Sequence, residues 1–356
     1  MKKTYKALLC GAAAVAAVGI AYAMDERFFE KAKDKLTVFK CRANSKIMEQ
    51  ALPLTDAMFP GPKVVSGADS AKKIPEVLKE LNVNKVMIVT GPTVGRTIVP
   101  PIAENLERHG IGYTIYDQVE ANPSVKTVEA IRAQYLENGC DGFLAIGGGS
   151  PMDAAKAAAA RVAKPNTPIG KMAGLMKVMI KVAPIVAVPT TSGTGSEVTM
   201  GAVISDHDER HKYAIMDPNL VPKYAVLDPK LTVSMPKFVT ATTGIDALTH
   251  AVESYVTWAY NNNASNRNAE EAVVKIFRNL KRAYEDGNDL EAREAMLIAS
   301  YKAGLAFNHT GVGYVHAIAH AMGGIYNTAH GLANAVIMPI VLEDYGTAVH
   351  PQLAHL

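Results

Sequence analysis

The chain has 356 residues, of which 49% are hydrophobic, and it carries a formal net charge of +3. This length exceeds one average domain, and the hydrophobic share can fill two ordinary cores, so we expect two domains. The charge is small and dispersed, with no Lys/Arg run interleaved with aromatic residues, so we expect no nucleic-acid partner. The three cysteines (Cys10, Cys41 and Cys140) form neither a Cys-x-x-Cys pair nor an even set, which argues against a thiolate zinc site and a disulfide framework.

The N-terminus carries a targeting pattern. Three lysines among the first six residues precede an uncharged run rich in Ala, Gly and Val, from residue 7 to residue 24. Two interpretations fit this run: a membrane anchor, or a secretory signal that ends at Ala21-Tyr22-Ala23. A buried Ala-rich helix fits less well, because the run is terminal and has a cationic flank. We therefore expect residues 1–24 to be an anchor or a signal, with membrane association through residues 7–24, and residues 25–59 to form a helix and a linker.

Residues 60–236 are predicted to form an α/β domain. Short apolar runs alternate there with helical stretches, which indicates a parallel sheet covered by helices on both faces. The predicted strands are residues 85–90, 113–116, 142–146 and 183–188. After residue 236 the pattern changes to long Ala-rich helices with a period of 3.6 residues and no convincing strand. Residues 237–356 are therefore predicted to form an all-helical domain.

A glycine loop, residues 147–150, directly follows the third predicted strand. Because glycine has no Cβ, the backbone amides of such a loop can approach a ligand closely. Ser150 is a candidate N-cap for the next helix, with Asp153 three residues later as an acidic variant of the capping box. Free N–H groups at a helix start behind a glycine loop bind anions, most often a pyrophosphate. The alternative is a plain glycine-rich turn, and neither G-x-G-x-x-G nor a Walker motif is present.

A second polar loop, residues 188–199, follows the fourth predicted strand. It carries six hydroxyl side chains and two glycines. Polar groups at the carboxyl end of a strand line the ligand crevice of a doubly wound sheet. An ordinary surface loop less often follows so apolar a strand, so we interpret this segment, the threonine loop, as part of a ligand site.

The predicted helical domain carries the most specific pattern in the chain. Asp246 and His250 are four residues apart, His316 and His320 are four residues apart, and His330 follows beyond a turn. Residues i and i+4 lie on one face of a helix, so each pair can converge on one point. Separate core histidines would explain any one of these residues, but their clustering is better explained by a single metal ion. One carboxylate and three imidazoles suit Fe²⁺ or Zn²⁺ and leave coordination positions open for a substrate.

From about Pro62 to about residue 345 the chain resembles the iron-containing (group III) alcohol dehydrogenase family. Four motifs carry the resemblance in the family's order: the glycine loop with its Asp and Lys, the threonine loop, residues 244–250 and residues 316–331. The resemblance implies an α/β dinucleotide-binding domain with a parallel sheet, followed by an all-helical metal-binding domain. This architecture is shared with dehydroquinate synthase.

The resemblance also implies which residues form the site. The ligands of Fe²⁺, or of Zn²⁺, would be Asp246, His250, His316 and His330. His320 would stand beside the metal, near the cofactor, either as the catalytic residue that relays a proton or as a residue that only supports the metal ligands. The residues implied for binding NADH or NADPH are Gly91, Asn122, Gly148, Gly149, Ser150, Asp153, Thr190, Thr191, Thr194 and Lys212.

The implied function is that of a metal-dependent alcohol dehydrogenase or aldehyde reductase, which transfers a hydride between NAD(P) and a small primary alcohol or aldehyde. We expect a homo-oligomer whose catalytic part is cytoplasmic. The alternatives are a zinc glycerol dehydrogenase-like enzyme, a dehydroquinate synthase-like enzyme, or a non-catalytic membrane-anchored fragment. The chain departs from the family in three ways. The N-terminal extension is not part of the family core, relatives continue with further helices so that truncation is expected at Leu356, and Gly91 stands where many NAD-preferring members carry aspartate.

Overall fold

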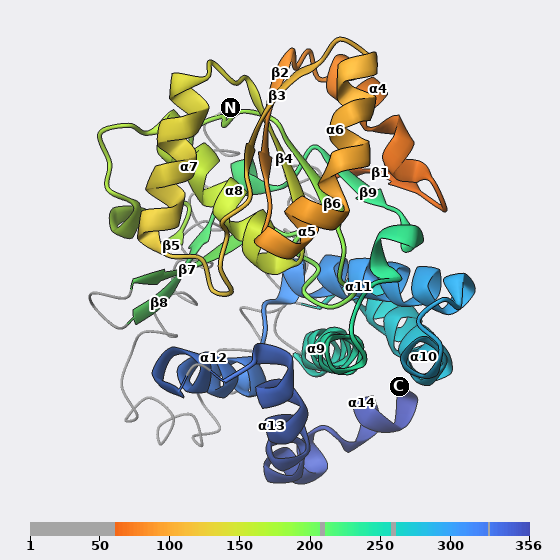
Figure 1. Ribbon diagram of the computed structural model, residues 1–356. Coiled ribbons are helices and arrows are strands. Elements are labelled where there is room, and N and C mark those ends of the chain that lie inside the picture. Colours follow the sequence, from red (N-terminus) through yellow and green to blue (C-terminus); the bar gives the residue numbers. More distant parts are fainter. Residues whose placement is uncertain (1–60, 207–210, 258–260, 327) are drawn as a thin grey trace, which may run out of the picture.

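The structure, a computed structural model, is shown in Figure 1. The residues that it describes are 61–206, 211–257, 261–326 and 328–356. The expected anchor or signal at residues 1–24 and the expected helix and linker at residues 25–59 lie outside the described residues. Among the described helices, none combines the length and the apolar character that crossing a membrane requires.

Six parallel strands form the central sheet, in the order β1-β9-β6-β4-β2-β3. They are β1 (Lys63–Ser66), β2 (Lys85–Val89), β3 (Gly112–Tyr116), β4 (Gly142–Gly147), β6 (Ile185–Pro189) and β9 (Tyr224–Leu227). The inner strands β4 and β6 are buried along their whole length, whereas the edge strands β1 and β3 are partly exposed. Strands β2, β3, β4 and β6 confirm the four predicted strands, whereas the four-residue strands β1 and β9 were not predicted.

A small second sheet lies beside the first and was also missed. Its strands are β5 (Gly174–Leu175), β7 (Gly201–Asp206) and β8 (His211–Met216), and β7 pairs with β8 in antiparallel fashion. The connection between β7 and β8 includes residues 207–210, which are not described. This sheet matters for the site because β8 carries Lys212 and β7 begins where the threonine loop ends.

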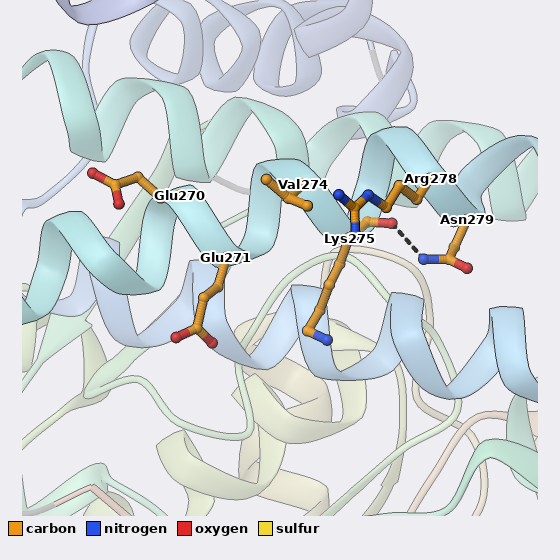
Figure 2. A pocket seen from close by; sticks show the side chains of 6 residues that line it. All are labelled: Glu270, Glu271, Val274, Lys275, Arg278 and Asn279. Atoms are coloured by element: carbon orange, nitrogen blue, oxygen red, sulfur yellow. Dashed lines mark hydrogen bonds between the residues drawn. The ribbon is translucent and has the colours of Figure 1, made fainter. Parts of the chain in front are cut away.

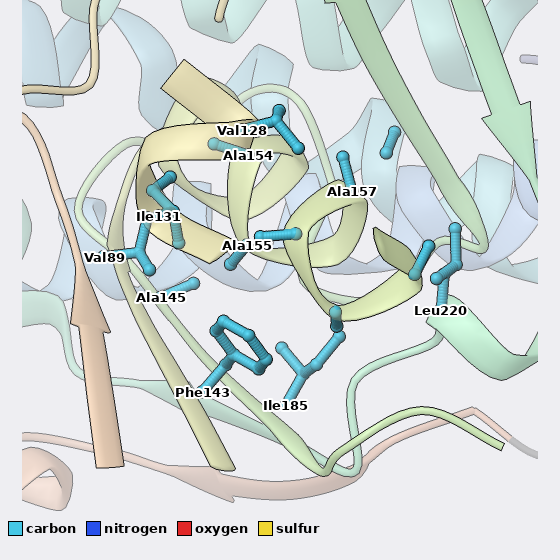
Figure 3. Close-up of a cluster of buried hydrophobic side chains, with 14 of the residues drawn as sticks. Val89, Val128, Ile131, Phe143, Ala145, Ala154, Ala155, Ala157, Ile185 and Leu220 are labelled. Carbon is cyan, nitrogen blue, oxygen red and sulfur yellow. The ribbon is translucent and has the colours of Figure 1, made fainter. Parts of the chain in front are cut away.

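Helices cover both faces of the central sheet (Figure 1). One face is covered by α7 (Val125–Glu137) and α8 (Gly149–Ala163), and the other by α4 (Ile74–Glu80) and α6 (Val99–Arg108). Figure 3 shows the first core, where Phe143 of β4 faces alanines of α8 such as Ala154 and Ala155. These small side chains let α8 lie close to the sheet, and this places the start of α8 directly beyond the end of β4.

The chain is helical in its described residues after β9. The main helices are α9 (Lys237–Val256), α10 (Asn263–Glu285), α11 (Leu290–Thr310), α12 (Tyr314–Tyr326), α13 (His330–Tyr345) and α14 (His350–His355). Helices α9, α10 and α11 share a core rich in alanine, and α12 and α13 form a smaller core of their own. The predicted change from a parallel sheet to helices is confirmed, and the predicted metal-binding residues lie on α9, α12 and α13.

Glycines bring the threonine loop into contact with the helices. A Cβ on Gly195, whose φ is +61°, would lie 2.7 Å from the Cα of Gly304 on α11. A Cβ on Gly193 would lie 2.6 Å from the Cβ of Thr243 on α9. Contacts this close tolerate no side chain on the loop at these two positions. The threonine loop therefore runs between the central sheet and the helices that carry the histidines.

Candidate metal centre and dinucleotide site

Three helices bring the acidic and histidine residues together. Asp246 and His250 lie one turn apart on α9, and His316 comes from the start of α12. Their ligand atoms all lie within 4.8 Å of one another, and all three side chains are buried. The rings of His250 and His316 stack with centroids 4.3 Å apart, while Phe307 of α11 stacks on His250 at 4.2 Å. The fixed rings show that the site is built by packing around these side chains.

His330, the first residue of α13, completes the set. Its Nε2 lies 3.4 Å from Oδ1 of Asp246, and its ring centroid lies 5.3 Å from that of His316. The amide nitrogen of Asn334, one turn further along α13, marks the point on which these groups converge. Nδ2 of Asn334 lies 2.7 Å from Oδ1 of Asp246, 3.2 Å from Nε2 of His316 and 3.3 Å from Nε2 of His330. Several lone pairs thus point at one place, as a cation requires.

Burial and charge set the protonation of these groups. Burial lowers the pKa of His250 to about 3 and also lowers the pKa of His330. Burial alone would raise the pKa of Asp246, but the charges of His250 and His330 outweigh it and hold that pKa well below its usual range. Neutral imidazoles and an ionised carboxylate are the forms that bind a metal ion. The donor set therefore fits a divalent first-row ion such as Fe²⁺.

Glu253, which orients His316, was not predicted from the sequence. Glu253 is buried on α9, and its Oε2 lies 2.6 Å from Nδ1 of His316. Its Oε1 accepts a hydrogen bond of 2.7 Å from the backbone N–H of Val315. Burial alone would lower the pKa of His316, but hydrogen bonds with Asp246 and Glu253 raise it to about 9, so this ring must give up a proton when a metal ion binds. The carboxylate holds Nδ1, so the opposite nitrogen, Nε2, faces the cluster.

His320 lies one turn after His316 on α12, beside the cluster. Its ring centroid lies 4.9 Å from that of His330 and 6.2 Å from that of His316. Burial, followed by the charges of His330 and His316, lowers the pKa of His320 to about 3. Its imidazole is therefore neutral near pH 7. This placement brings together the five residues of the predicted metal and catalytic set.

The glycine loop and the threonine loop meet at the carboxyl ends of β4 and β6. The backbone N–H of Thr190 donates a hydrogen bond of 2.9 Å to the carbonyl of Gly147. A Cβ on Gly148 would lie 3.1 Å from Oγ1 of Thr191, and one on Gly149 would lie 3.0 Å from Cγ2 of Thr194. The two loops thus form one cradle at the start of α8, where free N–H groups favour an anion.

The predicted capping box at Ser150 is wrong. Helix α8 begins at Gly149, its N-cap is Gly148, and no side chain caps it. Ser150 therefore lies inside the first turn, where its Oγ accepts a hydrogen bond of 3.3 Å from the N–H of Asn122. Oxygens of Asp153 accept hydrogen bonds from the hydroxyl of Ser196 and the N–H of Val203. The unused N–H groups at the start of α8 stay available to a ligand.

Asn122 and Lys212 connect the cradle with the histidines. Nζ of Lys212 donates a hydrogen bond of 2.8 Å to Oδ1 of Asn122, which itself adjoins Ser150. On its other side Lys212 approaches α12, because a Cβ on Gly323 would lie 3.3 Å from its Nζ. Burial lowers the pKa of Lys212. Gly91, the last residue predicted for the cofactor, lies between β2 and α5 (Pro92–Thr97), as the N-cap of α5.

A surface groove elsewhere on the molecule is unrelated to this site. It runs along α10 (Figure 2), where Nδ2 of Asn279 donates a hydrogen bond to the carbonyl of Lys275. The residues that line it are Glu270, Glu271, Val274, Lys275, Arg278 and Asn279. None of these residues belongs to the metal cluster or to the cradle, and their chemistry is that of a solvated helix face.

Glu197, in the threonine loop, makes the stability of the fold depend on pH. It is 1% exposed, and burial raises its pKa to about 7. A carboxyl whose pKa is higher in the folded than in the unfolded chain stabilises the fold at low pH and loses that effect as the pH rises through 7. We expect the free energy of unfolding to fall by on the order of 2 kcal/mol between about pH 5 and about pH 8.

This loss should be absent or much smaller in Glu197→Gln, which keeps the shape of the side chain without the ionisation. Chemical denaturation of both proteins across this pH range measures the difference. Parallel pH profiles for the two proteins would contradict the assignment of the loss to Glu197.

The chain is similar to known proteins over both its α/β part and its helical part. The family model for the iron-containing alcohol dehydrogenase matches residues 61–229, and the model for the C-terminal part of the Fe-containing alcohol dehydrogenase family matches residues 240–356. Alcohol dehydrogenase 4 of Saccharomyces cerevisiae (strain YJM789) is 37% identical over 278 residues, which are 78% of this chain and 72% of that protein.

Two further relatives agree. The NAD-dependent methanol dehydrogenase of Bacillus methanolicus is 36% identical over 304 residues, which are 85% of this chain and 79% of that protein. The crystal structure of a 1,3-propanediol oxidoreductase superposes with a TM-score of 0.78 and 35% identity, over 82% of this chain and 76% of that one. The chain belongs to the iron-containing alcohol dehydrogenase family.

Proposed function

We propose that the chain interconverts small primary alcohols and aldehydes, with a hydride passing to or from NAD(P) beside a metal ion held by Asp246, His250, His316 and His330. The observation that carries the proposal is the position of Lys212. It hydrogen-bonds Asn122 at the cradle and approaches α12 at Gly323. The cradle and the metal cluster are therefore neighbours, so a dinucleotide held in the cradle would lie beside a substrate at the cluster, as hydride transfer requires.

Each group has one task in this reaction. A bound Fe²⁺ supplies Lewis acidity, which polarises an aldehyde carbonyl or lowers the pKa of an alcohol. The glycine and threonine loops orient the dinucleotide through backbone N–H groups and hydroxyls. His320 stands beside the cluster, where its ring can relay the proton that the alcohol loses or the aldehyde gains.

The substrate class follows from similarity to proteins that act on small molecules. The names of relatives specify methanol in Bacillus methanolicus and lactaldehyde in Escherichia coli, and that of a similar structure specifies 1,3-propanediol. We propose that this chain takes substrates of the same size and acts as a homo-oligomer.

We also propose that the catalytic part lies in the cytoplasm, because nicotinamide cofactors are held there. Digestion of the catalytic part by protease added outside intact cells would contradict that location.

One experiment tests the proposed function. The absorbance of NADH or NADPH is followed with a panel of short aldehydes, before chelation, after chelation, and after adding back Fe²⁺ or Zn²⁺. We expect oxidation of the cofactor that chelation abolishes and the metal restores. Turnover that survives complete removal of the metal, or no turnover with any aldehyde when the metal is bound, would refute the proposal.

Gly91 allows a prediction about the choice of cofactor. An acidic side chain at the end of such a strand binds the adenosine ribose and repels a 2′-phosphate. Gly91 has no carboxylate, so we expect NADPH to be used with an efficiency comparable to or above that of NADH. Gly91→Asp should cost NADPH more than NADH, by about 1–3 kcal/mol in relative kcat/KM, as expected for a misplaced charge against a bound phosphate.

Gly91→Asn is the matched control for this change. A Cβ at this position would lie 3.1 Å from the carbonyl oxygen of Val119, so both variants need the same small backbone adjustment. Only Gly91→Asp adds the charge, so only this variant should change the ratio of the two kcat/KM values. A wild-type preference for NADH of about a hundredfold or more that Gly91→Asp leaves unchanged would show that other residues select the cofactor.

A further inference from the structure

Lys156, on α8, is a fully buried lysine whose charge faces the threonine loop. Its side chain is 0% exposed, and its Nζ donates hydrogen bonds to the carbonyls of Ser196, Thr199 and Gly201 at 2.7–2.9 Å. The hydroxyl oxygens of Ser196 and Thr199 lie 3.0 and 3.3 Å from the same nitrogen. An ammonium has three N–H donors, and three carbonyls at these distances engage all of them.

Asp153 joins the same segment from the preceding turn of α8. Its Oδ1 accepts a hydrogen bond of 2.8 Å from the hydroxyl of Ser196, and its Oδ2 accepts one of 3.0 Å from the N–H of Val203. One lysine and one aspartate therefore fix the backbone from Ser196 to Val203 against a single helix. We call Asp153, Lys156 and Ser196 the α8 clasp.

The α8 clasp lies directly behind the dinucleotide cradle. Helix α8 begins at the glycine loop, and the segment just before Ser196 carries Thr191 and Thr194, whose side chains would lie 3.0–3.1 Å from a Cβ on Gly148 or Gly149. The clasp thus fixes the position of both loops relative to one helix. Lys156 is fully buried and its nitrogen is saturated by loop oxygens, so its effect on a ligand passes through the threonine loop.

Burying a charged lysine costs free energy, because the ammonium group loses its contact with water. Burial lowers the pKa of Lys156 to about 8, which measures how much the charged form loses by leaving water. Apolar side chains often replace buried charges with no loss of stability, so stability alone is a weak explanation for this lysine. Its three carbonyl partners instead fix the path of the threonine loop and of the residues that follow it.

We propose that Lys156 and Asp153 are positioning residues for dinucleotide binding, which clasp the threonine loop to α8 and keep Thr191 and Thr194 against the glycine loop. This inference rests on the proposed function, since it concerns the same cofactor. It goes beyond that function because it makes the affinity for the dinucleotide depend on Lys156 and Asp153. The charged groups of these two side chains bind atoms of the protein around the threonine loop.

The test compares Lys156→Met with the wild-type enzyme. Methionine keeps the unbranched stem of the side chain up to Cε and lacks the ammonium group, so the threonine loop loses its hydrogen-bond donor. We expect the dissociation constant of NADH, from fluorescence titration, to rise by about tenfold or more, with a parallel rise in its KM. The kcat and the metal content should change by less than about threefold, because the α8 clasp does not touch the histidine cluster.

Arg293→Met is the matched control. Arg293 is another buried cation, 2% exposed, and it binds the carbonyl of Gly287 and the hydroxyl of Thr240 away from the cradle. Its loss should lower the melting temperature without changing the dissociation constant of NADH. An unchanged constant in folded Lys156→Met, or an equal rise in Arg293→Met, would overturn the proposal.

Two further measurements keep the proposal testable. If Lys156→Met does not fold, Ser196→Ala removes the hydroxyl that Asp153 and Lys156 share, and the dissociation constant should rise by about threefold; no rise would overturn the proposal. Amide hydrogen exchange of residues 190–203 needs no cofactor. In Lys156→Met we expect faster exchange than in the wild type in these residues but not in α9, and this result would support the α8 clasp. If the chain bound no NADH, that failure would refute the proposed function, while the exchange result would still test the clasp.

Discussion

Replacing His316 with alanine is expected to abolish metal binding and turnover together, and Asp246→Ala should do the same. Both side chains are buried, and their ligand atoms lie within 4.8 Å of each other and of the third ligand, His250. A metal site that loses one of four ligands loses affinity and also the fixed geometry that leaves a position open for the substrate. We expect turnover to fall by about a hundred- to a thousandfold or more, since removal of a group that stabilises the developing charge typically costs that much.

Metal content by elemental analysis, alongside the rate of NADH oxidation, measures both effects. His109→Ala is the matched control, since His109 is an exposed histidine whose ring contacts the backbone carbonyl of Asn105 far from the site. It should keep full metal content and full activity. Full metal occupancy in both Asp246→Ala and His316→Ala would show that the site has been assigned to the wrong residues.

The histidine pattern was predictable because it is local. Asp246 and His250 share one face of α9, and His316 and His320 share one face of α12, as spacing by four residues requires. Long helices have a regular period of apolar residues, so the helical structure after residue 236 was predictable as well. What spacing alone could not show is that α9, α12 and α13 meet, because that contact depends on packing between segments distant in sequence.

The missed features are those that depend on distant partners. Glu253 is a single acidic residue in a helical segment, and its partner His316 lies 63 residues further along the chain. Asn334 is likewise an ordinary helical asparagine until α13 packs on α9 and places its amide beside Asp246. The strands β1 and β9 were missed because four residues give too short a run for periodicity, although each pairs in register within the sheet. Local spacing therefore predicted the Asp and His residues of the cluster, but it could not predict the residues that hydrogen-bond to them.

The second large effect that we expect is a loss of metal affinity when Glu253, the hydrogen-bond partner of His316, is replaced. Its carboxylate accepts two hydrogen bonds, one from His316 and one from the N–H of Val315. In Glu253→Gln only one oxygen remains as an acceptor, so either the ring of His316 or the N–H of Val315 loses its partner inside a buried site. The negative charge that makes His316 a stronger ligand is also lost. We expect metal affinity to fall by about 10- to 100-fold, as is typical when the group that orients a ligating histidine is changed.

Competition with a chelator of known affinity measures this change, and Glu270→Gln is its control. Glu270 also pairs with a histidine, His355, at 3.3 Å, but on the surface of the helical part. Its loss should leave metal affinity unchanged, because both partners are solvated and bind nothing at the cluster. An affinity in Glu253→Gln within about twofold of wild type would mean that packing against His250 and Phe307 alone orients His316. In that case the carboxylate would only satisfy the start of α12, and Glu253→Gln would lower the melting temperature while leaving metal affinity unchanged.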